Sequence, residues 1–230
     1  MARLSKRVRE NEKKQPASAL PLDDAIKAIK EFKGPRFDQT VEVCMHLGVD
    51  PRLADQIVRG SISLPKGIGK NKRVIAFCAD GQVGECKEAG AIEACGQELV
   101  EKIEKGWMDF DVAIASPDMM RVISKLGRVL GPRGLMPSPK AGTVTKDVSQ
   151  AVQEYAAGKV EYRTDKSGNV HAVVGKMSFP EADLAENLRF FIDTIERARP
   201  NSTKGVYIKK ISISGTMTPG VQVEHVAAAV

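Results

Sequence analysis

The sequence predicts a mixed α/β and α+β fold in two domains, a discontinuous α+β domain into which a smaller α/β domain is inserted. Apolar side chains alternate along 40–47 and again along 206–214, a period typical of strands with one buried face. Between them, 73–78 and 111–115 are short and continuously apolar, as expected of parallel strands covered on both faces. Terminal segments of one pattern that bracket a segment of another indicate that the chain leaves the first domain and later returns to it.

The N-terminal segment begins with a basic stretch. Residues 1–15 carry six basic and two acidic side chains, which we interpret as a loosely held arm. Leu22, Ile26 and Ile29 are spaced to share one face of a helix. The elements predicted for this segment are a helix at 22–30 and strands at 40–47 and 57–64.

The run Lys66-Gly67-Ile68-Gly69-Lys70 combines glycines and lysines, a composition typical of a hinge. We place the domain boundary there, so that 1–67 and 159–230 form the discontinuous domain and 68–158 forms the insert. The elements predicted for the insert are strands at 73–78 and 111–115 and helices at 89–105, 119–126 and 148–157.

The C-terminal segment returns to alternation. Strands at 159–163 and 170–174 flank a turn at 165–168, a pattern that predicts a hairpin. Apolar residues at helical spacing predict a long helix over 180–198, and a strand over 206–214 follows it. Residues 225–230 have the composition of an unstructured tail.

Composition limits the classes of protein to consider. With 42% hydrophobic and 28% charged residues, the 230-residue chain is typical of globular proteins. No apolar run reaches the roughly 20 residues needed to cross a bilayer, and no secretory signal follows Met1, so we expect a cytoplasmic protein without a membrane partner. The four cysteines lack the spacing of a zinc site or a disulfide framework, and the three histidines lack metal-ligand spacing. We therefore expect free, buried thiols and no metal.

The net charge of +6 is unevenly distributed. The predicted insert, 68–158, holds twelve basic and twelve acidic residues, whereas the two flanks together hold twenty-three basic and seventeen acidic residues. A basic surface concentrates a polyanion and contributes affinity that does not depend on sequence. A charge of this size also serves solubility alone, so the count leaves both interpretations open.

Signatures of catalysis do not occur in the sequence. Gly67-Ile68-Gly69 begins like a dinucleotide fingerprint, but Lys72 stands where the third glycine is needed, and a strand follows it rather than a helix. No Gly-Lys is followed by Ser or Thr, and neither Gly-x-Ser-x-Gly nor His-Glu-x-x-His is present. We expect neither enzymatic activity nor a cofactor.

Three segments are candidates for contact with RNA. Arg36 and Phe37 offer a cation and a ring that can stack on a base, although a lone Phe is also a common core anchor. The Ser-Gly-Thr-Met-Thr-Pro-Gly run at 214–220 suits the shallow minor groove of RNA, and is equally an ordinary turn. The stretch 121–143 is basic and rich in Gly and Pro, and its Leu130, Leu135 and Met136 could simply anchor a loop. These alternatives stay open on the residues alone.

Four motifs bear on these alternatives through a resemblance, which favours RNA contact for Phe37 and Thr216-Met217 and says less about the basic stretch at 121–146. They are FDQTVEVCMHLGVDPRLADQIVRGSISLPKGIGK at 37–70, GRVLGPRGLMPSPKAGTVT at 127–145, GNVHAVVGKMSF at 168–179 and the SGTMTPG run. In this order they resemble the bacterial form of the ribosomal protein L-one family, over nearly the whole chain. The resemblance implies a discontinuous α+β sandwich domain with an inserted Rossmann-like domain. It also implies that the protein is a component of the large subunit within the ribosome and a monomer outside it.

The resemblance implies three RNA partners, namely the stalk helices of large-subunit rRNA, the exit-site tRNA whose release the stalk accompanies, and the protein's own operon mRNA, whose translation it represses. The implied RNA-binding residues are Arg36, Phe37, Thr40, Glu42, Lys166, Ser167, His171, Ser212, Ser214, Thr216 and Met217. Candidates for a secondary RNA contact are Arg121, Lys125, Arg128, Arg133 and Lys140, which could face tRNA, other RNA bound by the insert, or only solvent. The Thr218-Pro219-Gly220 ending departs from the expected family pattern. The alternatives are a nucleotide-dependent enzyme that uses the insert, or a non-specific nucleic-acid chaperone.

Overall fold

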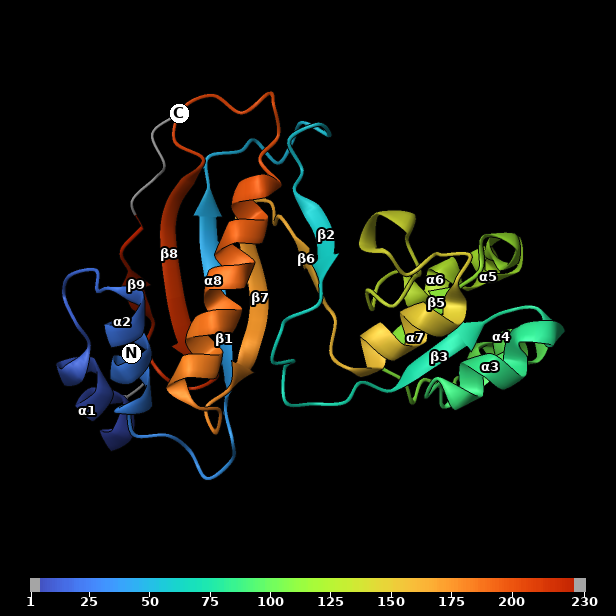
Figure 1. The fold of residues 1–230 in the computed structure, drawn as a ribbon, viewed down its shortest axis with the longest axis horizontal. Helices are drawn as coiled ribbons and strands as arrows, with labels where there is room; N and C mark the ends of the chain where they lie inside the picture. The colour runs from blue at the N-terminus through green and yellow to red at the C-terminus, as the bar shows by residue number, and fades with distance from the viewer. Residues whose placement is uncertain (1–4, 226–230) are drawn as a thin grey trace. The chain divides into compact units, whose positions relative to one another are not determined.

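A computed structural model of the protein describes residues 5–225, which form the mixture of helices and sheets that the sequence predicts. Contacts divide the chain into two compact units (Figure 1). Unit 1 comprises Met1–Gly69 and Val160–Val230, and unit 2 comprises Lys70–Lys159. In the described part of the chain no helix is both long enough and apolar enough to cross a membrane.

Unit 1 is built on a four-stranded antiparallel sheet in the order β7-β1-β8-β9. Its strands are β1 (Thr40–Leu47), β7 (Asn169–Lys176), β8 (Ile208–Gly215) and β9 (Val221–Val223). Strand β1 is central and pairs on one side with β7 and on the other with β8. Strands from opposite ends of the sequence therefore form one sheet.

The alternation predicted for β1 determines which face of this sheet is covered. Val41, Val43, Met45 and Leu47 are all buried. They face helices α2 (Leu22–Lys30) and α8 (Glu181–Arg197), and in Figure 1 α8 runs along the sheet with α2 beside β9. Leu184, Leu188, Phe191 and Ile195 line the buried side of α8. The opposite side of the sheet, here called the outer face, is left for polar side chains.

A buried amide fastens α8 to the chain where it leaves unit 1. Asn187 is fully buried, and its Nδ2 donates hydrogen bonds to the carbonyl oxygens of Gly67 (3.0 Å) and Val174 (2.9 Å). Its Oδ1 accepts one from the backbone N–H of Lys66 at 3.1 Å. A buried amide with three partners fixes its neighbours more firmly than apolar contact alone. Asn187 thereby holds the Lys66–Gly67 segment against β7.

The hairpin predicted at 159–174 is wrong. Strand β6 (Val160–Arg163) pairs with β2 (Arg59–Ile62) in a separate two-stranded sheet, while β7 pairs with β1. One bridge, Thr164 to Val170, links the two predicted arms. Thr164 explains the change of partner, because its buried hydroxyl bonds both the N–H and the carbonyl of Val58 at 2.8 Å. The turn at 165–168 was recognised correctly, but turn chemistry does not decide which strands pair.

Unit 2 contains a parallel sheet in the order β4-β3-β5, as the apolar strands of the middle segment predicted. Its elements are β3 (Val74–Phe77), β4 (Glu93–Cys95), β5 (Val112–Ala115), α3 (Val83–Glu88), α4 (Gln97–Glu104) and α7 (Val148–Ala156). Val74 and Ala76 pack with residues of α3 and α7 in one cluster. Ile75 and Phe77 pack with residues of α4 in another. Both faces of the sheet are therefore covered.

Two helices predicted for the insert differ in the structure. The predicted helix 89–105 is interrupted by strand β4, and only α4 remains helical. Gly90, at φ 105°, ends α3, and the following residues pair with β3. The predicted helix 119–126 is a series of short turns: η2 (Pro117–Met119), α5 (Met120–Ile123), η3 (Ser124–Leu126) and α6 (Gly127–Leu130). Helical spacing of apolar residues predicted both helices. Strand pairing with β3 interrupts the first, and tight turns divide the second.

The chain ends are also more ordered than predicted. Residues 6–14 form helix α1 (Lys6–Lys14), whose N-cap Ser5 accepts a bond from Val8 N, so the expected loose arm is wrong there. A further strand, β9, follows the predicted turn at 214–220. His225, placed in the unstructured tail, lies with Nε2 3.2 Å from Glu196 Oε1. The rest of that tail, 226–230, lies outside the described residues, as does the beginning of the basic arm at 1–4.

Cys44, Cys78, Cys86 and Cys95 form no disulfide bond with one another, as predicted. Cys78 and Cys86 are buried in unit 2, whereas Cys44 and Cys95 are only partly buried. Burial raises the pKa of the Cys86 thiol. Buried thiols with a raised pKa carry little thiolate and behave as small apolar side chains.

Replacement of Asn187 tests its role in unit 1. Asn187→Ala removes three hydrogen bonds and leaves buried backbone groups without partners, so we expect a loss of about 2–4 kcal/mol in the free energy of unfolding. Chemical denaturation measures this loss. Asn201→Ala, at an exposed loop position, is the matched control and should change stability by less than about 0.5 kcal/mol. Equal effects of the two substitutions would show that Asn187 has no special role.

Candidate nucleic-acid interface

The outer face of the unit 1 sheet is polar and arranged in rows. Glu42, Cys44 and His46 of β1 project from it, on the side opposite the buried residues of that strand. The strand register places neighbours beside each of them. Glu42 lies beside Ser214 and Val173, Cys44 beside Ser212 and His171, and His46 beside Lys210 and Asn169. Hydroxyl, imidazole, carboxylate and ammonium groups thus share one flat surface.

One end of this surface is closed by Thr40 and Thr216. The Thr216 hydroxyl accepts a hydrogen bond from Thr40 N at 3.1 Å and lies 3.3 Å from the carbonyl oxygen of Thr40, to which it can donate. The backbone N–H of Thr216 donates to that same carbonyl oxygen at 3.1 Å. Lys176 Nζ donates to the Thr40 hydroxyl at 2.8 Å. The start of β1 and the loop after β8 are therefore joined side by side.

Met217 is held in the open by bonds to its backbone. Its N–H donates to Gln39 Oε1 at 2.9 Å, and the turn is closed by Gly215 N, which donates to the Thr218 hydroxyl at 2.9 Å. Gln39 is buried, yet the Met217 side chain remains 51% exposed. A flexible thioether held at the surface can adapt its shape to a partner.

Phe37 is presented in a similar way from the loop before β1. Its ring is 54% exposed, so the interpretation of Phe37 as a core anchor does not hold. The next residue, Asp38, fixes the loop by accepting bonds from Ser178 N (3.2 Å) and Ser178 Oγ (2.8 Å). A hollow of about 340 Å³ lies beside the ring. Its lining residues are Lys30, Phe32, Gly34, Pro35, Phe37, Asp38, Gln39 and Met177.

The predicted RNA-binding residues form a series along the sheet rather than one cluster. Arg36, Phe37, Thr40, Thr216 and Met217 come from the two loops and strand ends joined by Thr40 and Thr216. The next rows along the outer face hold Glu42 with Ser214, then His171 with Ser212. Lys166 and Ser167 lie in the turn before β7, near the other end of β1, about 20 Å from Thr40 at strand spacing.

That far end is organised by Asp165. Its Oδ1 accepts bonds from the backbone N–H groups of Asn169 and Ser167, both at 2.8 Å, and its Oδ2 accepts one from Asn169 Nδ2 at 3.1 Å. These hydrogen bonds hold the pKa of Asp165 below its usual range, and the bond from the Asn169 N–H has the largest effect. The positive charge of His171 acts in the same direction. Asn169 Oδ1 in turn lies 2.8 Å from His46 Nδ1, so the turn and the outer face are linked.

The environment of Cys44 reflects its position on this face. Burial, and after it the negative charge of Asp165, raise the pKa of the Cys44 thiol, while Lys210 acts in the opposite direction. The thiol is therefore neutral at physiological pH and adds no charge to the outer face.

Sequence reasoning assigned Thr216 to direct contact and missed the residues that position it. In the structure the Thr216 hydroxyl is already bonded to Thr40, so its main observed role is to hold the loop. Gln39, Lys176 and Asp38 fix the same loops and were not singled out. Their one sequence signal is position, since Gln39 and Asp38 stand immediately before an alternating strand. That signal does not tell a buried amide from an exposed one.

In unit 2 the predicted secondary contact residues are all exposed. Among the residues that the structure describes, no ion pair involves Arg121, Lys125, Arg128, Arg133 or Lys140. Leu130 is buried, and Leu135 and Met136 pack against the same hydrophobic cluster. The loop is thus anchored by its apolar residues while its cations face solvent, so the two interpretations of this stretch are compatible.

Comparison with known proteins gives two matches. The profile of the "Ribosomal protein L1p/L10e family" matches residues 28–219. A relative from Protochlamydia amoebophila (strain UWE25), named "Large ribosomal subunit protein uL1", is 50% identical over 225 residues, which cover 97% of this chain and 95% of the relative. Both matches include the loops that carry Phe37 and Met217.

The turn at Asp165 predicts a pH-dependent contribution to stability. Because its pKa is lower in the folded state than in the unfolded chain, this carboxylate stabilises the fold above about pH 4, and the effect is lost as the pH falls through the lower folded value. Asp165→Asn should therefore cost about 1 kcal/mol or less near pH 7, since solvent screens this exposed turn. Denaturation of both proteins between pH 3 and pH 7 checks this. A difference that did not shrink in acid would contradict it.

Proposed function

Because the chain belongs to the ribosomal protein L1p/L10e family, we propose that it is a structural component of the large ribosomal subunit that binds ribosomal RNA without acting on it chemically. The observation that carries this proposal is the pairing of Thr40 with Thr216, which brings Phe37 and Met217, both about half exposed, to one end of a polar sheet face. Exposed apolar side chains beside a polar, well-bonded surface are typical of a binding site.

The chemistry of the interface suits folded RNA. Double-stranded RNA presents a wide, shallow minor groove with 2′-hydroxyl groups, which a flat surface of hydroxyl, imidazole and carboxylate groups can contact. Ser212, Ser214 and His171 supply donors and acceptors, and Glu42 can accept hydrogen bonds from 2′-hydroxyl or base amino groups. Phe37 can stack on a base or ribose, while Arg36 binds phosphate. Recognition would therefore rest on shape as well as charge.

The finer parts of the function follow from the family. The RNA bound is proposed to be the stalk region of large-subunit rRNA, with the protein taking part in release of deacylated tRNA from the exit site. The same surface would bind a similarly shaped site on the protein's own mRNA and repress its translation. The exposed cations of unit 2 from Arg121 to Lys140, which form no ion pair in the described part of the chain, support a secondary RNA contact there. As a ribosomal component the protein would act in the cytoplasm, and as a monomer outside the ribosome.

We further infer that the two compact units are the two domains predicted from the sequence. The division at Gly69/Lys70 and Lys159/Val160 lies within two residues of the predicted boundaries at 67/68 and 158/159, which supports this inference. The parallel sheet β4-β3-β5, packed on both faces, favours a Rossmann-like description of the insert. The helices α2 and α8 on one side of the antiparallel sheet favour an α+β sandwich for the other domain.

Two other functions make different predictions. The sequence has no Gly-Lys followed by Ser or Thr, which argues against a nucleotide-dependent enzyme of the phosphate-loop kind. Calorimetry with ATP, GTP and NAD should give no heat of binding. A general nucleic-acid chaperone would bind any duplex RNA through charge alone. Equal affinity for the stalk fragment and for an unrelated duplex would favour the chaperone over the proposed function.

Substitution at the strand-end loop tests the proposed interface. Met217→Ala removes exposed contact area, and we expect roughly tenfold weaker binding to a stalk rRNA fragment, the effect of losing one interface side chain worth about 1–2 kcal/mol. Thermal unfolding should be unchanged, because Met217 supports little of the core. Filter binding or fluorescence anisotropy at a fixed salt concentration measures the affinity. Val206→Ala, which trims another exposed apolar side chain in the loop before β8, is the matched control.

Thr216→Val tests the positioning of the same loop. Valine has the shape of threonine but can neither accept the Thr40 N–H nor donate to the Thr40 carbonyl, so the loop loses both side-chain bonds to Thr40 and keeps the backbone bond. We expect a similar loss of RNA affinity together with a small loss of stability, about 1 kcal/mol. If neither Thr216→Val nor Met217→Ala altered affinity, RNA would bind a different surface.

A further inference from the structure

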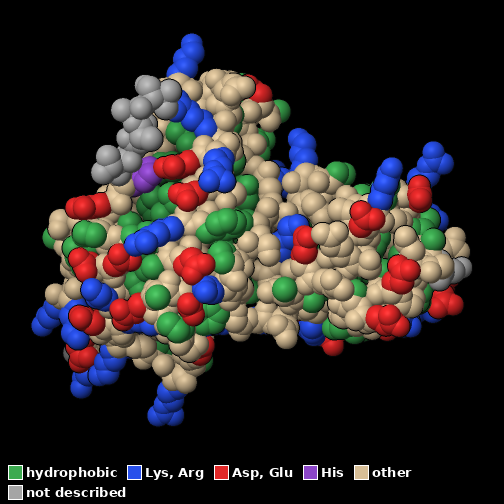
Figure 2. Space-filling model, viewed as in Figure 1, with side chains coloured by type: hydrophobic (Ala, Val, Ile, Leu, Met, Phe, Trp, Pro, Cys, Tyr) green, Lys and Arg blue, Asp and Glu red, His purple; other side chains and the backbone are tan. Residues whose placement is uncertain are grey.

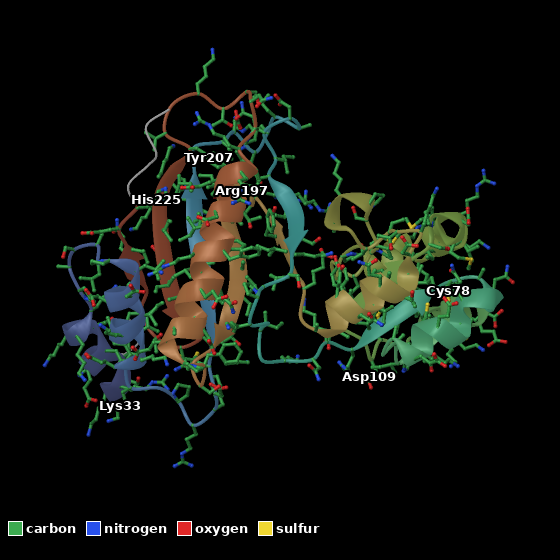
Figure 3. All side chains as sticks on the ribbon, in the orientation of Figure 1. Lys33, Cys78, Asp109, Arg197, Tyr207 and His225 are labelled. Carbon is green, nitrogen blue, oxygen red and sulfur yellow. The ribbon has the colours of Figure 1, made fainter. Side chains whose placement is uncertain are left out.

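Helix α1 lies against the same end of unit 1 as the two loops of the candidate interface. Figure 2 shows Lys and Arg side chains gathered around α1, and Lys33, labelled in Figure 3, lies beside it. The sequence-based assignment of RNA contacts included no residue of this helix. Its cations lie close to the proposed RNA contacts in the fold.

Side-chain hydrogen bonds connect α1 to the bases of both loops. Asn11, 1% exposed, donates through Nδ2 to the Lys33 carbonyl (3.1 Å) and accepts from Lys33 N (3.0 Å). Lys33 is four residues before Phe37. At the C-terminal end of the helix, Gln15 Nε2 donates to the carbonyl of Gly220 at 2.8 Å, three residues after Met217. A buried amide with reciprocal backbone bonds is a specific attachment, so α1 is a fixed part of this end of the unit.

The attachment through Asn11 determines which side of α1 faces solvent. At 100° per residue, Lys6, Arg9 and Lys13 lie within about 60° of one another and on the side away from Asn11. All three are exposed, and they span about 10 Å along the helix axis. The three cations thus form a stripe on a rigid support.

Within residues 5–225 the three cations of the stripe form no ion pair, although Glu10 lies four residues after Lys6 and three before Lys13. Among residues 5–225, the ion pair that involves α1 is Glu10 with Lys33, and none involves Lys6, Arg9 or Lys13. The Glu10 carboxylate is directed to Lys33 instead, so it offsets only part of the repulsion among the three like charges on neighbouring turns. A row of phosphates removes that repulsion and adds affinity through counterion release.

We propose that the Lys6–Arg9–Lys13 stripe of α1 is a phosphate-binding surface that extends the RNA interface beyond the end of the sheet. This inference rests on the proposed function, since its ligand is the backbone of the same RNA. The bonds of Asn11 and Gln15 set the stripe in a fixed position relative to Phe37 and Met217. Phosphate contacts of this kind fix the register of a protein on nucleic acid, while the loops contact groups of the RNA itself.

The test is the salt dependence of binding to a stalk rRNA fragment. The variant Lys6→Gln/Arg9→Gln/Lys13→Gln keeps good helix-forming side chains but removes three charges. Its matched control is Arg52→Gln/Arg197→Gln/Lys204→Gln. These three cations lie in loops and at a helix end elsewhere in unit 1, are exposed, and form no ion pair with any residue between 5 and 225. Arg197 lies at the other end of unit 1 from Lys33 (Figure 3). Circular dichroism and thermal unfolding establish that both variants keep their fold.

We expect the α1 variant to bind roughly tenfold more weakly than the wild type at low salt. Its plot of log affinity against log salt concentration should be shallower by about two to three, near 0.9 for each phosphate that the protein no longer neutralises. The control should change both quantities much less. If the α1 variant behaved like the control while Met217→Ala still weakened binding, this inference would be wrong and the proposed function would stand. If the wild-type protein did not bind the fragment, both would be wrong.

Discussion

The central position of β1 is the constraint on which the rest of unit 1 depends. Residues 40–47 pair on one side with 169–176 and on the other with 208–215. A central strand cannot leave its backbone groups unpaired, so the first quarter of the chain is incomplete without the last. The chain must therefore close on itself around β1. Unit 2, Lys70–Lys159, is formed by the part of the chain that lies between these two segments of unit 1.

The candidate interface follows from the same arrangement. Helices α2 and α8 cover the face of the sheet that bears Val43 and Met45, and the polar outer face remains for a partner. Because β1 and β8 are antiparallel, the start of one lies beside the end of the other, and Thr40 meets Thr216. The loops that continue from these residues carry Phe37 and Met217. Strand register brings together two loops that are far apart in sequence, and the bonds of Thr216 and Gln39 hold them there.

The sequence predicted those parts of the fold in which one periodic pattern extends over many residues. β1 was predicted at its observed bounds, and the amphipathic pattern of 180–198 became α8 with small differences at its ends. The three-residue strands β4 and β9 were missed, because so short a segment has no readable period and forms only where a neighbour offers backbone partners. The predicted hairpin failed for a related reason, since the choice of partner depends on burial and on side chains such as Thr164.

Residues that act by holding others were hardest to find. Asn187, Gln39 and Asn11 are buried polar side chains with hydrogen-bond partners elsewhere in the chain. No local sequence pattern therefore predicts their role. Phe37 and Met217 were proposed as RNA contacts because the family resemblance outweighed their ordinary interpretations, and the structure shows that both are exposed. A family resemblance suggests which residues contact a partner. The residues that hold them in position can be identified only from the folded structure.

The central position of β1 also has a consequence for the order in which the chain can fold as it is synthesised. When β1 emerges, neither neighbouring strand has been made, and its buried side chains Val43 and Met45 have no sheet to join. Residues 70–159, by contrast, contain all three strands of their own sheet and can form it before residue 169 is added. The first strand to leave the exit tunnel is thus among the last to be paired, and its exposed apolar side chains are a hazard for aggregation throughout that interval.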